Sequence, residues 1–304
     1  MWHRLPYALR KLRQTLIPIR YEPPDYALWN LQARLGLTPA EVSRLAMPGP
    51  FPPRFRYRHF TVPKKDGGRR EICAPGPRLK EVQRQILRAY LDPRAPHPAA
   101  MGFRRALSIA DHAWAHAGAA IIITADIEDF FPSTRARRVA AWWAAQGFND
   151  AEVHLLTRLT TYRGSLPQGA PTSPALSNLV NAELDAALHR RAQQSGGVYT
   201  RYCDDLAFSW PDGGRPPADF EPAVRAALLG AGYRLHSGAE KGWQMWARRD
   251  EPEVTGLVLT RRGGVALPPP LYARMRSLAR SDDPHDAARL AGYKGYELMI
   301  RKRR

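Results

Sequence analysis

Residues 199–209 read YTRYCDDLAFS, and this stretch decides the fold of the chain. Strand-forming residues lie on both sides of Asp204 and Asp205, so the pattern predicts a β-hairpin with the two carboxylates at its tip. Carboxylates that are this close repel each other unless a cation lies between them, and their hard oxygen atoms suit Mg²⁺. Asp-Asp pairs are also common in solvated turns, so the remaining sequence has to decide between a metal site and an ordinary turn.

The charge of the chain favours a polyanionic partner. Its 304 residues include 46 Lys and Arg against 28 Asp and Glu, which leaves a net charge of +18. A field of this sign attracts nucleic acids, whose phosphates it neutralises. A basic surface that only keeps the protein soluble is the alternative. A membrane surface is less favoured, because no long basic amphipathic helix stands out.

The cysteine content and the hydropathy pattern exclude several classes. Cys73 and Cys203 are the only cysteines and form no CxxC motif, so neither a disulfide framework nor a thiolate zinc site is indicated. No apolar run approaches the roughly 18 residues needed to span a bilayer. We therefore expect a cytoplasmic protein with no membrane partner.

A third carboxylate follows a second strand. Residues 119–125 include three consecutive isoleucines and form an apolar run that is too short for a helix, which predicts a strand buried on both faces. Asp126 follows directly. In an α+β fold with helices packed on one face of the sheet, this strand end and the tip of the 199–209 hairpin would lie side by side. Asp126, Asp204 and Asp205 would then share one metal site.

The remaining chain shows alternating helix and strand signals and no internal repeat. A hairpin turn is predicted at residues 64–68, within an extended stretch from Tyr57 to Ala74. Other predicted elements are two short helices within 25–47, helices at 79–91, from Ser133, at 173–188 and at 220–229, a strand at 254–260, and a basic helical tail from Leu271.

Three ordered motifs resemble the retron and group II intron type of reverse transcriptase. They are TADIEDFFPS at 124–133, SLPQGAPTSPALSNLV at 165–180 and YTRYCDDLAFS at 199–209. The resemblance implies an α+β right-hand polymerase fold, in which an antiparallel palm sheet packs on helices. It implies an N-terminal helical extension at 1–56, fingers at 57–118 with part of 145–170, a palm at 119–260, and a thumb with a basic end at 261–304.

The same resemblance implies RNA-directed DNA synthesis from dNTPs. Asp126, Asp204 and Asp205 would bind two Mg²⁺ ions, for which Mn²⁺ is a possible substitute, and the backbone carbonyl of Ile127 would be a further ligand. This agrees with the chemistry, because phosphoryl transfer depends on positioning and charge neutralisation more than on covalent help.

Three residues are implied to border the incoming nucleotide. Phe131 lies five residues after the first aspartate, where a bulky ring would clash with a 2′-hydroxyl and select deoxynucleotides; a core aromatic is the alternative. Gln168 and Gly169 resemble the loop beside the nucleotide and template, where glycine permits close backbone approach.

Three basic residues are implied to bind the triphosphate. Lys64 and Arg70 match family positions on the fingers hairpin, although a solvated basic hairpin is the alternative. Lys241 falls in the segment that resembles the motif with a lysine near the leaving pyrophosphate. The residues around it, HSGAEK at 236–241, lack the usual asparagine, which leaves its role as a general acid open.

Three segments are implied to contact RNA. Val254-Thr255-Gly256 resembles the VTG signature of retron enzymes. Residues 108–116 resemble the retron NAxxH segment, with His112 in place of the asparagine and His116 retained; two structural histidines are the alternative. The basic end with Arg301, Lys302 and Arg303 is expected to bind phosphates, and a disordered tail is its alternative.

The leading hypothesis is a retron reverse transcriptase. It would copy part of a structured noncoding RNA of the msr-msd type into single-stranded DNA (msDNA), primed from an RNA 2′-hydroxyl. The family implies antiphage defence with an effector or toxin protein. Alternatives are a reverse transcriptase of a group II intron, a diversity-generating element or another defence system, and an RNA-binding protein without catalysis. The three intact aspartates argue against the last.

Overall fold

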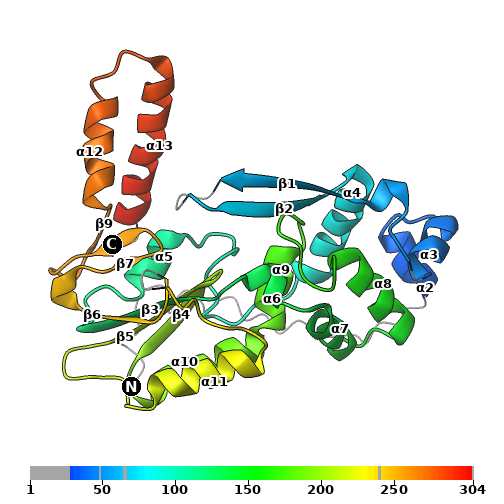
Figure 1. Cartoon of the computed structure of the whole chain (residues 1–304), viewed down its shortest axis with the longest axis horizontal. Helices are drawn as coiled ribbons and strands as arrows, with labels where there is room; N and C mark the ends of the chain where they lie inside the picture. The colour runs from blue at the N-terminus through cyan, green and yellow to red at the C-terminus, as the bar shows by residue number, and fades with distance from the viewer. Residues whose placement is uncertain (1–27, 48, 64–66, 239–240, 303–304) are drawn as a thin grey trace.

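The computed structural model describes residues 28–302, apart from residue 48, residues 64–66 and residues 239–240. Three antiparallel sheets organise this part of the chain (Figure 1). The central sheet has the strand order β4-β5-β3-β6, a hairpin is formed by β1 and β2, and a small sheet has the order β7-β8-β9. The central strands are β3 (Ile121–Asp126), β4 (Val198–Tyr202), β5 (Asp205–Trp210) and β6 (Gln244–Ala247).

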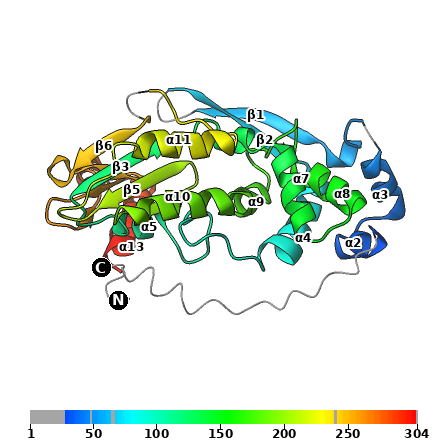
Figure 2. The same cartoon turned by 90° about the horizontal axis from the view of Figure 1, so that it is seen from below.

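Strand β3 lies inside the central sheet and is buried on both faces, as its apolar run predicts. Ile123 packs in a core formed with helices α10 (Ala182–Gln194) and α11 (Phe220–Gly230). Ile122 packs on the opposite face, in a core that includes residues of α5 (Ile109–Trp114) and the small sheet. Figure 2 shows α10 and α11 lying across one face of the sheet. The end of β3 is therefore held from both sides.

A second unit consists mainly of helices and carries the β1–β2 hairpin, which extends from it (Figure 1). Its core contains Trp143, Leu79 and Leu156, each buried completely. The elements of this unit are α2 (Leu28–Arg34), α3 (Pro39–Ala46), η2 (Pro53–Phe55), β1 (Tyr57–Pro63), β2 (Arg69–Pro75), α4 (Pro77–Ile86) with the π turn η3 (Leu87–Leu91), α6 (Phe130–Ser133), α7 (Ala136–Ala145), α8 (Asp150–Thr160) and α9 (Ser173–Val180).

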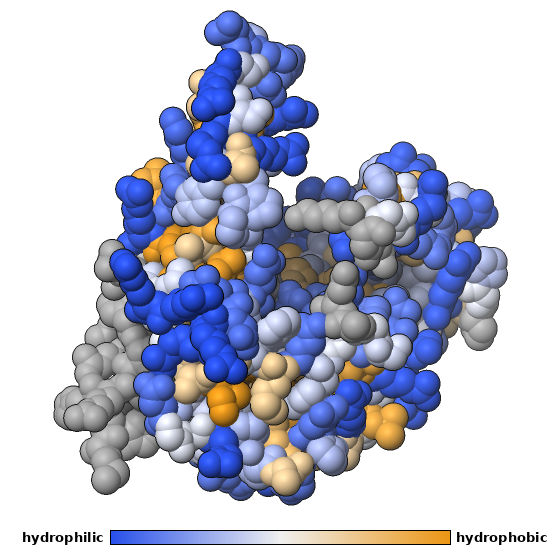
Figure 3. All heavy atoms as spheres, turned by 60° about the vertical axis from the view of Figure 1, so that its left-hand side comes forward, coloured by the Kyte–Doolittle hydropathy of each residue, from blue (hydrophilic) through white to orange (hydrophobic). Residues whose placement is uncertain are grey.

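The last part of the chain forms a projecting helical hairpin. The small sheet of β7 (Glu253–Val254), β8 (Leu257–Leu259) and β9 (Val265–Ala266) leads into α12 (Pro269–Leu278) and α13 (Pro284–Arg301). These two helices pack side by side and stand away from the central sheet (Figure 1). Figure 3 shows a hollow between this hairpin and the neighbouring lobe of the molecule. None of the described helices is both long and apolar enough to cross a membrane.

Three predicted elements differ in detail from the structure. The helix predicted at 173–188 is divided at Asn181 into α9 and α10, and the helix predicted from Ser133 begins only at Ala136, as α7. The strand predicted at 254–260 is two strands, β7 and β8, because Thr255 (φ 51°) and Gly256 (φ 77°) adopt left-handed conformations and form a turn. Strand β6 and the short 3-10 turn η4 (Arg248–Asp250) that follows it were not predicted.

Candidate active site

Strand pairing brings the three aspartates to one end of the central sheet. Asp126 ends β3, and its register partner on the antiparallel strand β5 is Asp205. The backbone N–H of Ile127 donates to the carbonyl of Asp204 at 2.9 Å. The turn of the hairpin is Cys203-Asp204, one residue earlier than predicted, because Asp205 already pairs with Tyr202. Backbone hydrogen bonds therefore set the positions of all three carboxylates.

The two paired carboxylates resist ionisation together. Burial raises the pKa of Asp205 to about 8, and the negative charges of Asp126 and Asp204 add to this rise. Burial also raises the pKa of Asp126, where the charge of Asp204 acts in the same direction and Lys241 opposes it. A bound cation would replace the proton that such a pair otherwise retains.

The donor set suits a hard divalent metal. Asp126 and Asp205 share a side-chain hydrogen bond, so their oxygens already lie together. Carboxylate and backbone carbonyl oxygens are the ligands that Mg²⁺ and Mn²⁺ prefer. No choice of one oxygen from each of the three aspartates places all three atoms within 4.8 Å of one another.

A buried ion pair holds the hairpin that carries Asp204 and Asp205. Arg201 on β4 is completely buried and contacts Asp185 of α10, with Nη2 to Oδ2 at 2.6 Å. Its Nη1 also donates to the carbonyl of Cys203 at 2.9 Å. Cys203 has a φ of 61°, in the left-handed region that non-glycine residues rarely occupy. Arg201 thus stabilises the strained residue that precedes the two aspartates.

The loop before α5 forms backbone hydrogen bonds with the same hairpin. The N–H of Arg201 donates to the carbonyl of Ala99, and the N–H of Met101 donates back to the carbonyl of Arg201, both at 2.7 Å. Gly102 comes so close that a Cβ atom there would lie 2.5 Å from the backbone nitrogen of Cys203. Asn178 of α9 donates to the carbonyl of Gly102 at 2.8 Å. Only glycine fits at this position.

The sequence did not reveal this support. Arg201 lies inside the decisive motif, and Gly102 and Asn178 are unremarkable in sequence, because their roles depend on contacts between segments that are far apart in the chain. Successive residues of a strand point to opposite faces of the sheet, so the position of Arg201 on β4 is a local signal that its side chain points inward. This signal does not identify Asp185 as the partner of the buried charge.

An aromatic surface flanks the carboxylates. Phe131 is half-buried, and its ring centroid lies 5.8 Å from that of Phe103, which is 44% exposed. Phe130 is a core residue and packs on Tyr233. Phe103 was not singled out by sequence analysis, since a lone phenylalanine in a loop carries no motif of its own.

The Gln168-Gly169 loop packs against the β1–β2 hairpin. The N–H of Cys73 donates to the carbonyl of Gln168 at 2.8 Å. Gly169 has a φ of 123°, and a Cβ atom there would lie 3.1 Å from the carbonyl oxygen of Cys73. Glycine is therefore required both by the backbone conformation and by the close approach to β2.

The three basic residues expected at the triphosphate differ in where they lie relative to the aspartates. Lys64 lies outside the described residues, and Arg70 is exposed on β2, opposite Val62. The backbone carbonyl of Lys241 accepts a hydrogen bond from the N–H of Asp126 at 2.9 Å. Its charge also lowers the pKa of the Asp126 and Asp205 carboxyls, so the structure brings Lys241 to the aspartates.

The segments expected to contact RNA are partly buried. His112 and His116 are inaccessible to solvent, and burial lowers the pKa of His112 to about 4, which keeps its ring neutral. His112 Nδ1 lies 2.9 Å from the hydroxyl of Thr255, whereas His116 hydrogen-bonds to strands β4 and β5. Neither ring is accessible to RNA in this structure. His112 on α5 instead contacts the Thr255-Gly256 turn, and His116, just after α5, connects this segment to the β4–β5 hairpin.

The other members of these segments differ in exposure. Val254 is buried in a core, while Gly256 is exposed at the turn. Arg301 and Lys302 are exposed at the end of α13, and Arg303 lies outside the described residues. Of the described residues in these segments, the exposed ones therefore lie at the turn and at the basic end of α13.

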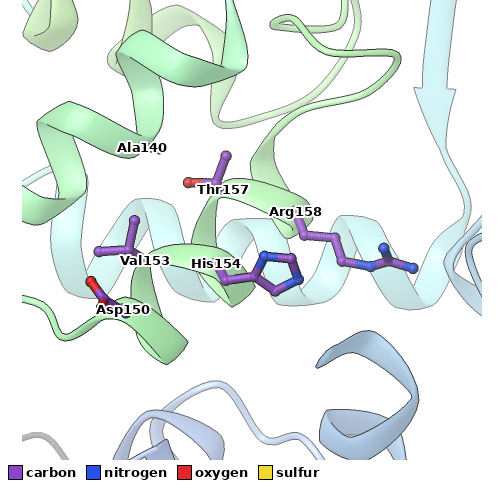
Figure 4. A pocket seen from close by; sticks show the side chains of 6 residues that line it. All are labelled: Ala140, Asp150, Val153, His154, Thr157 and Arg158. Carbon is purple, nitrogen blue, oxygen red and sulfur yellow. The ribbon is translucent and has the colours of Figure 1, made fainter. Parts of the chain in front are cut away.

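A separate hollow lies away from the carboxylates. It has a volume of about 420 Å³ and lies along α7 and α8 (Figure 4). Its lining residues are Ala140, Asp150, Val153, His154, Thr157 and Arg158. None of them belongs to the predicted site, so this hollow does not define the chemistry.

Comparison with known proteins identifies relatives of the chain. The family described as reverse transcriptase (RNA-dependent DNA polymerase) matches residues 62–213. The retron Mx162 reverse transcriptase of Myxococcus xanthus is 34% identical over 77% of this chain and 53% of that protein. The retron Ec86 reverse transcriptase of Escherichia coli is 41% identical over 51% of this chain and 49% of that protein. The chain spans about half the length of these two curated relatives.

Solved structures with the same architecture include apo telomerase from Candida tropicalis. It matches with a TM-score of 0.53 and 11% sequence identity, over 82% of this chain and 53% of that chain. At this identity the match concerns the fold alone. Together with the family match, it confirms the predicted α+β right-hand fold, with an antiparallel palm sheet packed on helices.

Proposed function

The chain belongs to the reverse transcriptase family, and we propose that it is the RNA-directed DNA polymerase of a retron. The observation that carries the proposal is the register pairing of Asp126 with Asp205, two partly buried carboxyls with raised pKa values beside Asp204. The retron reverse transcriptases among its relatives support the retron assignment.

Asp126, Asp204 and Asp205 would hold two Mg²⁺ or Mn²⁺ ions, with the Ile127 carbonyl as a further ligand. Bound there, the metals would lower the pKa of an attacking hydroxyl and neutralise a leaving pyrophosphate. Lys241 adds positive charge beside the carboxylates. Arg201 and Gly102 fix the hairpin, so that the carboxylates are in place before substrate binds.

The nucleotide would lie between the aromatic surface and the Gln168-Gly169 loop. We propose that the Phe131 ring excludes a 2′-hydroxyl and so selects dNTPs. Lys64 and Arg70 on the β1–β2 hairpin would bind the triphosphate, since this hairpin packs against Gln168 and Gly169. Lys241 would lie near the leaving pyrophosphate.

We propose that the domains divide as the resemblance implies. Residues 57–118 with part of 145–170 would be the fingers, 119–260 the palm, and 261–304 the thumb, preceded by a helical extension at 1–56. The projecting α12–α13 hairpin and the hollow beside it support the thumb assignment (Figure 3). Template and product would occupy that hollow, with Gly256, Arg301 and Lys302 as RNA contacts.

The proposed template is a structured msr-msd type RNA, copied into msDNA from an RNA 2′-hydroxyl in the cytoplasm, with an effector protein in antiphage defence. Sequencing the nucleic acid that co-purifies with the protein tests this. We expect a branched RNA–DNA molecule with a 2′-5′ linkage. Tightly bound intron RNA would instead assign the enzyme to a group II intron and contradict the retron proposal.

A further inference from the structure

Three side chains with potential metal-ligand atoms lie together on the β1–β2 hairpin, on a different sheet from the three aspartates. His59 and Cys73 are register partners on the two antiparallel strands, and Glu71 lies two residues before Cys73 on β2. One ligand atom from each of these three side chains lies within 4.8 Å of the other two. Within the described part of the chain, this is the only group of three His, Cys, Asp or Glu side chains that meets this distance.

The carboxylate of Glu71 and the sulfur of Cys73 both lie close to one nitrogen of His59. His59 Nδ1 lies 3.1 Å from Glu71 Oε1 and 3.5 Å from Cys73 Sγ. Ligands bound to zinc at about 2.0–2.3 Å in a tetrahedral arrangement lie roughly 3.3–3.6 Å apart. These two separations from His59 Nδ1 thus differ from those of a tetrahedral site by only a few tenths of an ångström, and the third pair of ligand atoms lies within 4.8 Å. The set of imidazole, thiolate and carboxylate is also one that zinc accepts.

The imidazole is oriented from its other side. His59 Nε2 lies 3.0 Å from the hydroxyl of Tyr162, and the two rings are in contact. Metal-bound histidines usually use the second ring nitrogen in such a hydrogen bond, which fixes the ring and the tautomer. When Nε2–H donates to Tyr162, Nδ1 presents a lone pair to Cys73 and Glu71. A cation bound where the three groups meet would accept this lone pair.

The group is accessible and lies beside functional residues. The side chains of His59 and Glu71 are 31% and 59% exposed, so an ion can reach them from solvent. Arg163 approaches Glu71 at 3.8 Å but is 67% exposed, so it can move away when a cation binds. Cys73 also donates its N–H to the carbonyl of Gln168.

We propose that His59, Glu71 and Cys73 form a binding site for a zinc-type divalent ion, with the fourth position open to water. The site would connect the two strands of the hairpin beside the Gln168-Gly169 loop and would stiffen this junction. It is independent of the proposed polymerase reaction, because its ligands and its metal preference differ from those of the three aspartates.

Cobalt titration of the full chain in excess Mg²⁺ tests the proposal, because the oxygen ligands of the aspartates give no thiolate-to-cobalt absorption. We expect one equivalent of Co²⁺ to produce a near-ultraviolet thiolate band that Zn²⁺ then removes. Cys73→Ala should abolish the band, and Cys203→Ser, which changes the other cysteine, should retain it. Circular dichroism of each variant checks that it is folded.

A second variant tests whether Tyr162 supports metal binding by orienting the His59 ring. Tyr162→Phe should keep the band but weaken Co²⁺ binding by about tenfold, since it removes only the partner of the ligating histidine. Absence of the band in the folded wild-type protein, or its persistence in Cys73→Ala, would overturn the proposal. These readouts are of metal binding, so they do not depend on whether the chain polymerises DNA.

Discussion

Asp205 determines how the site responds to pH. Its pKa is raised from an ordinary value of 3.8 to about 8, first by burial and then by the charges of Asp126 and Asp204. A carboxyl whose pKa is raised on folding stabilises the fold while it is protonated. This contribution is complete below about pH 4 and is lost as the pH rises through about 8.

The first prediction concerns metal-free protein in the presence of a chelator. Asp205→Asn cannot ionise, so it should be more stable than wild type by about 1–3 kcal/mol at pH 9, and the difference should shrink at pH 5. Thermal unfolding at the two pH values measures this. Asp282→Asn, at an exposed position, is the control and should show no such trend. A stability gain that is larger at pH 5 than at pH 9 would contradict the electrostatic account.

The second prediction concerns the sugar. Phe131→Ala should raise the ratio of ribonucleotide to deoxynucleotide incorporation by about tenfold or more, because it removes the ring proposed to exclude the 2′-hydroxyl. Single-nucleotide extension with dNTPs and rNTPs measures the ratio. Phe60→Ala removes an exposed ring from β1 and should leave the ratio unchanged. An unchanged ratio in Phe131→Ala would remove this residue as the sugar gate.

The third prediction concerns the methyl group that Gly102→Ala adds beside Cys203. Gly102→Ala should lower kcat by about 10- to 100-fold, because its Cβ displaces the backbone of Cys203 and with it the carboxylates. Gly230→Ala, where no atom lies within 4 Å of the added Cβ, is the matched control and should retain activity. Primer extension under saturating dNTP measures both variants. Wild-type kcat in Gly102→Ala would show that the hairpin tolerates the shift.

At the residue scale, the carboxylates could be predicted from the sequence, whereas the residues that hold them in place could not. Asp126 and Asp205 are indicated by strand patterns and turn residues, which are local signals. The close approach of Gly102 to Cys203 arises only when two segments about 100 residues apart meet. The burial of His112 and His116 was left open for the same reason, since it depends on contacts with Thr255 and with strands β4 and β5, which are far away in the sequence.

At the scale of elements, the β4–β5 hairpin depends on the ion pair between Arg201 and Asp185. Both side chains are fully buried, so the removal of one partner leaves an uncompensated charge. The fourth prediction is that Arg201→Met lowers the free energy of unfolding by about 3–5 kcal/mol. Denaturant unfolding measures this. Additional replacement of Asp185 by Leu should recover part of the loss, because it removes the unpaired carboxylate.

An exposed pair provides the control for that measurement. Arg225 and Glu221 on α11 form an ion pair at 2.7 Å with both side chains substantially exposed. Arg225→Met should therefore cost about 0.5 kcal/mol or less. If Arg201→Met costs no more than this control, the ion pair does not stabilise the hairpin.

Several predicted elements are divided in the structure, because single residues with particular hydrogen bonds or φ values interrupt a hydrophobic pattern that continues past them. Asn181 interrupts an apolar pattern that continues across α9 and α10, and its side chain hydrogen-bonds to Ser177 and Tyr233. At the turn after Val254, Thr255 takes a left-handed conformation that its β-branched side chain disfavours. Strand β6 is short, and it becomes a strand only through pairing with β3.

At the scale of the whole molecule, the net charge of +18 predicted a polyanionic partner, and the resemblance of three motifs to reverse transcriptases implied the polymerase-like arrangement. The relative placement of the α12–α13 hairpin and the β1–β2 unit was not predictable, because it depends on packing between the small sheet, α5 and the end of α13. That placement creates the hollow in Figure 3.

The central claim is that Asp126, Asp204 and Asp205 support RNA-templated DNA synthesis, and primer extension tests it most directly. With Mg²⁺, a primed RNA template and dNTPs, the wild-type protein should make DNA. Asp204→Asn combined with Asp205→Asn should reduce the rate by about 10³-fold or more while RNA binding persists, because metal-dependent charge stabilisation contributes several kcal/mol. Undiminished synthesis by the double variant, or none by folded wild-type protein bound to the primed template, would contradict the account.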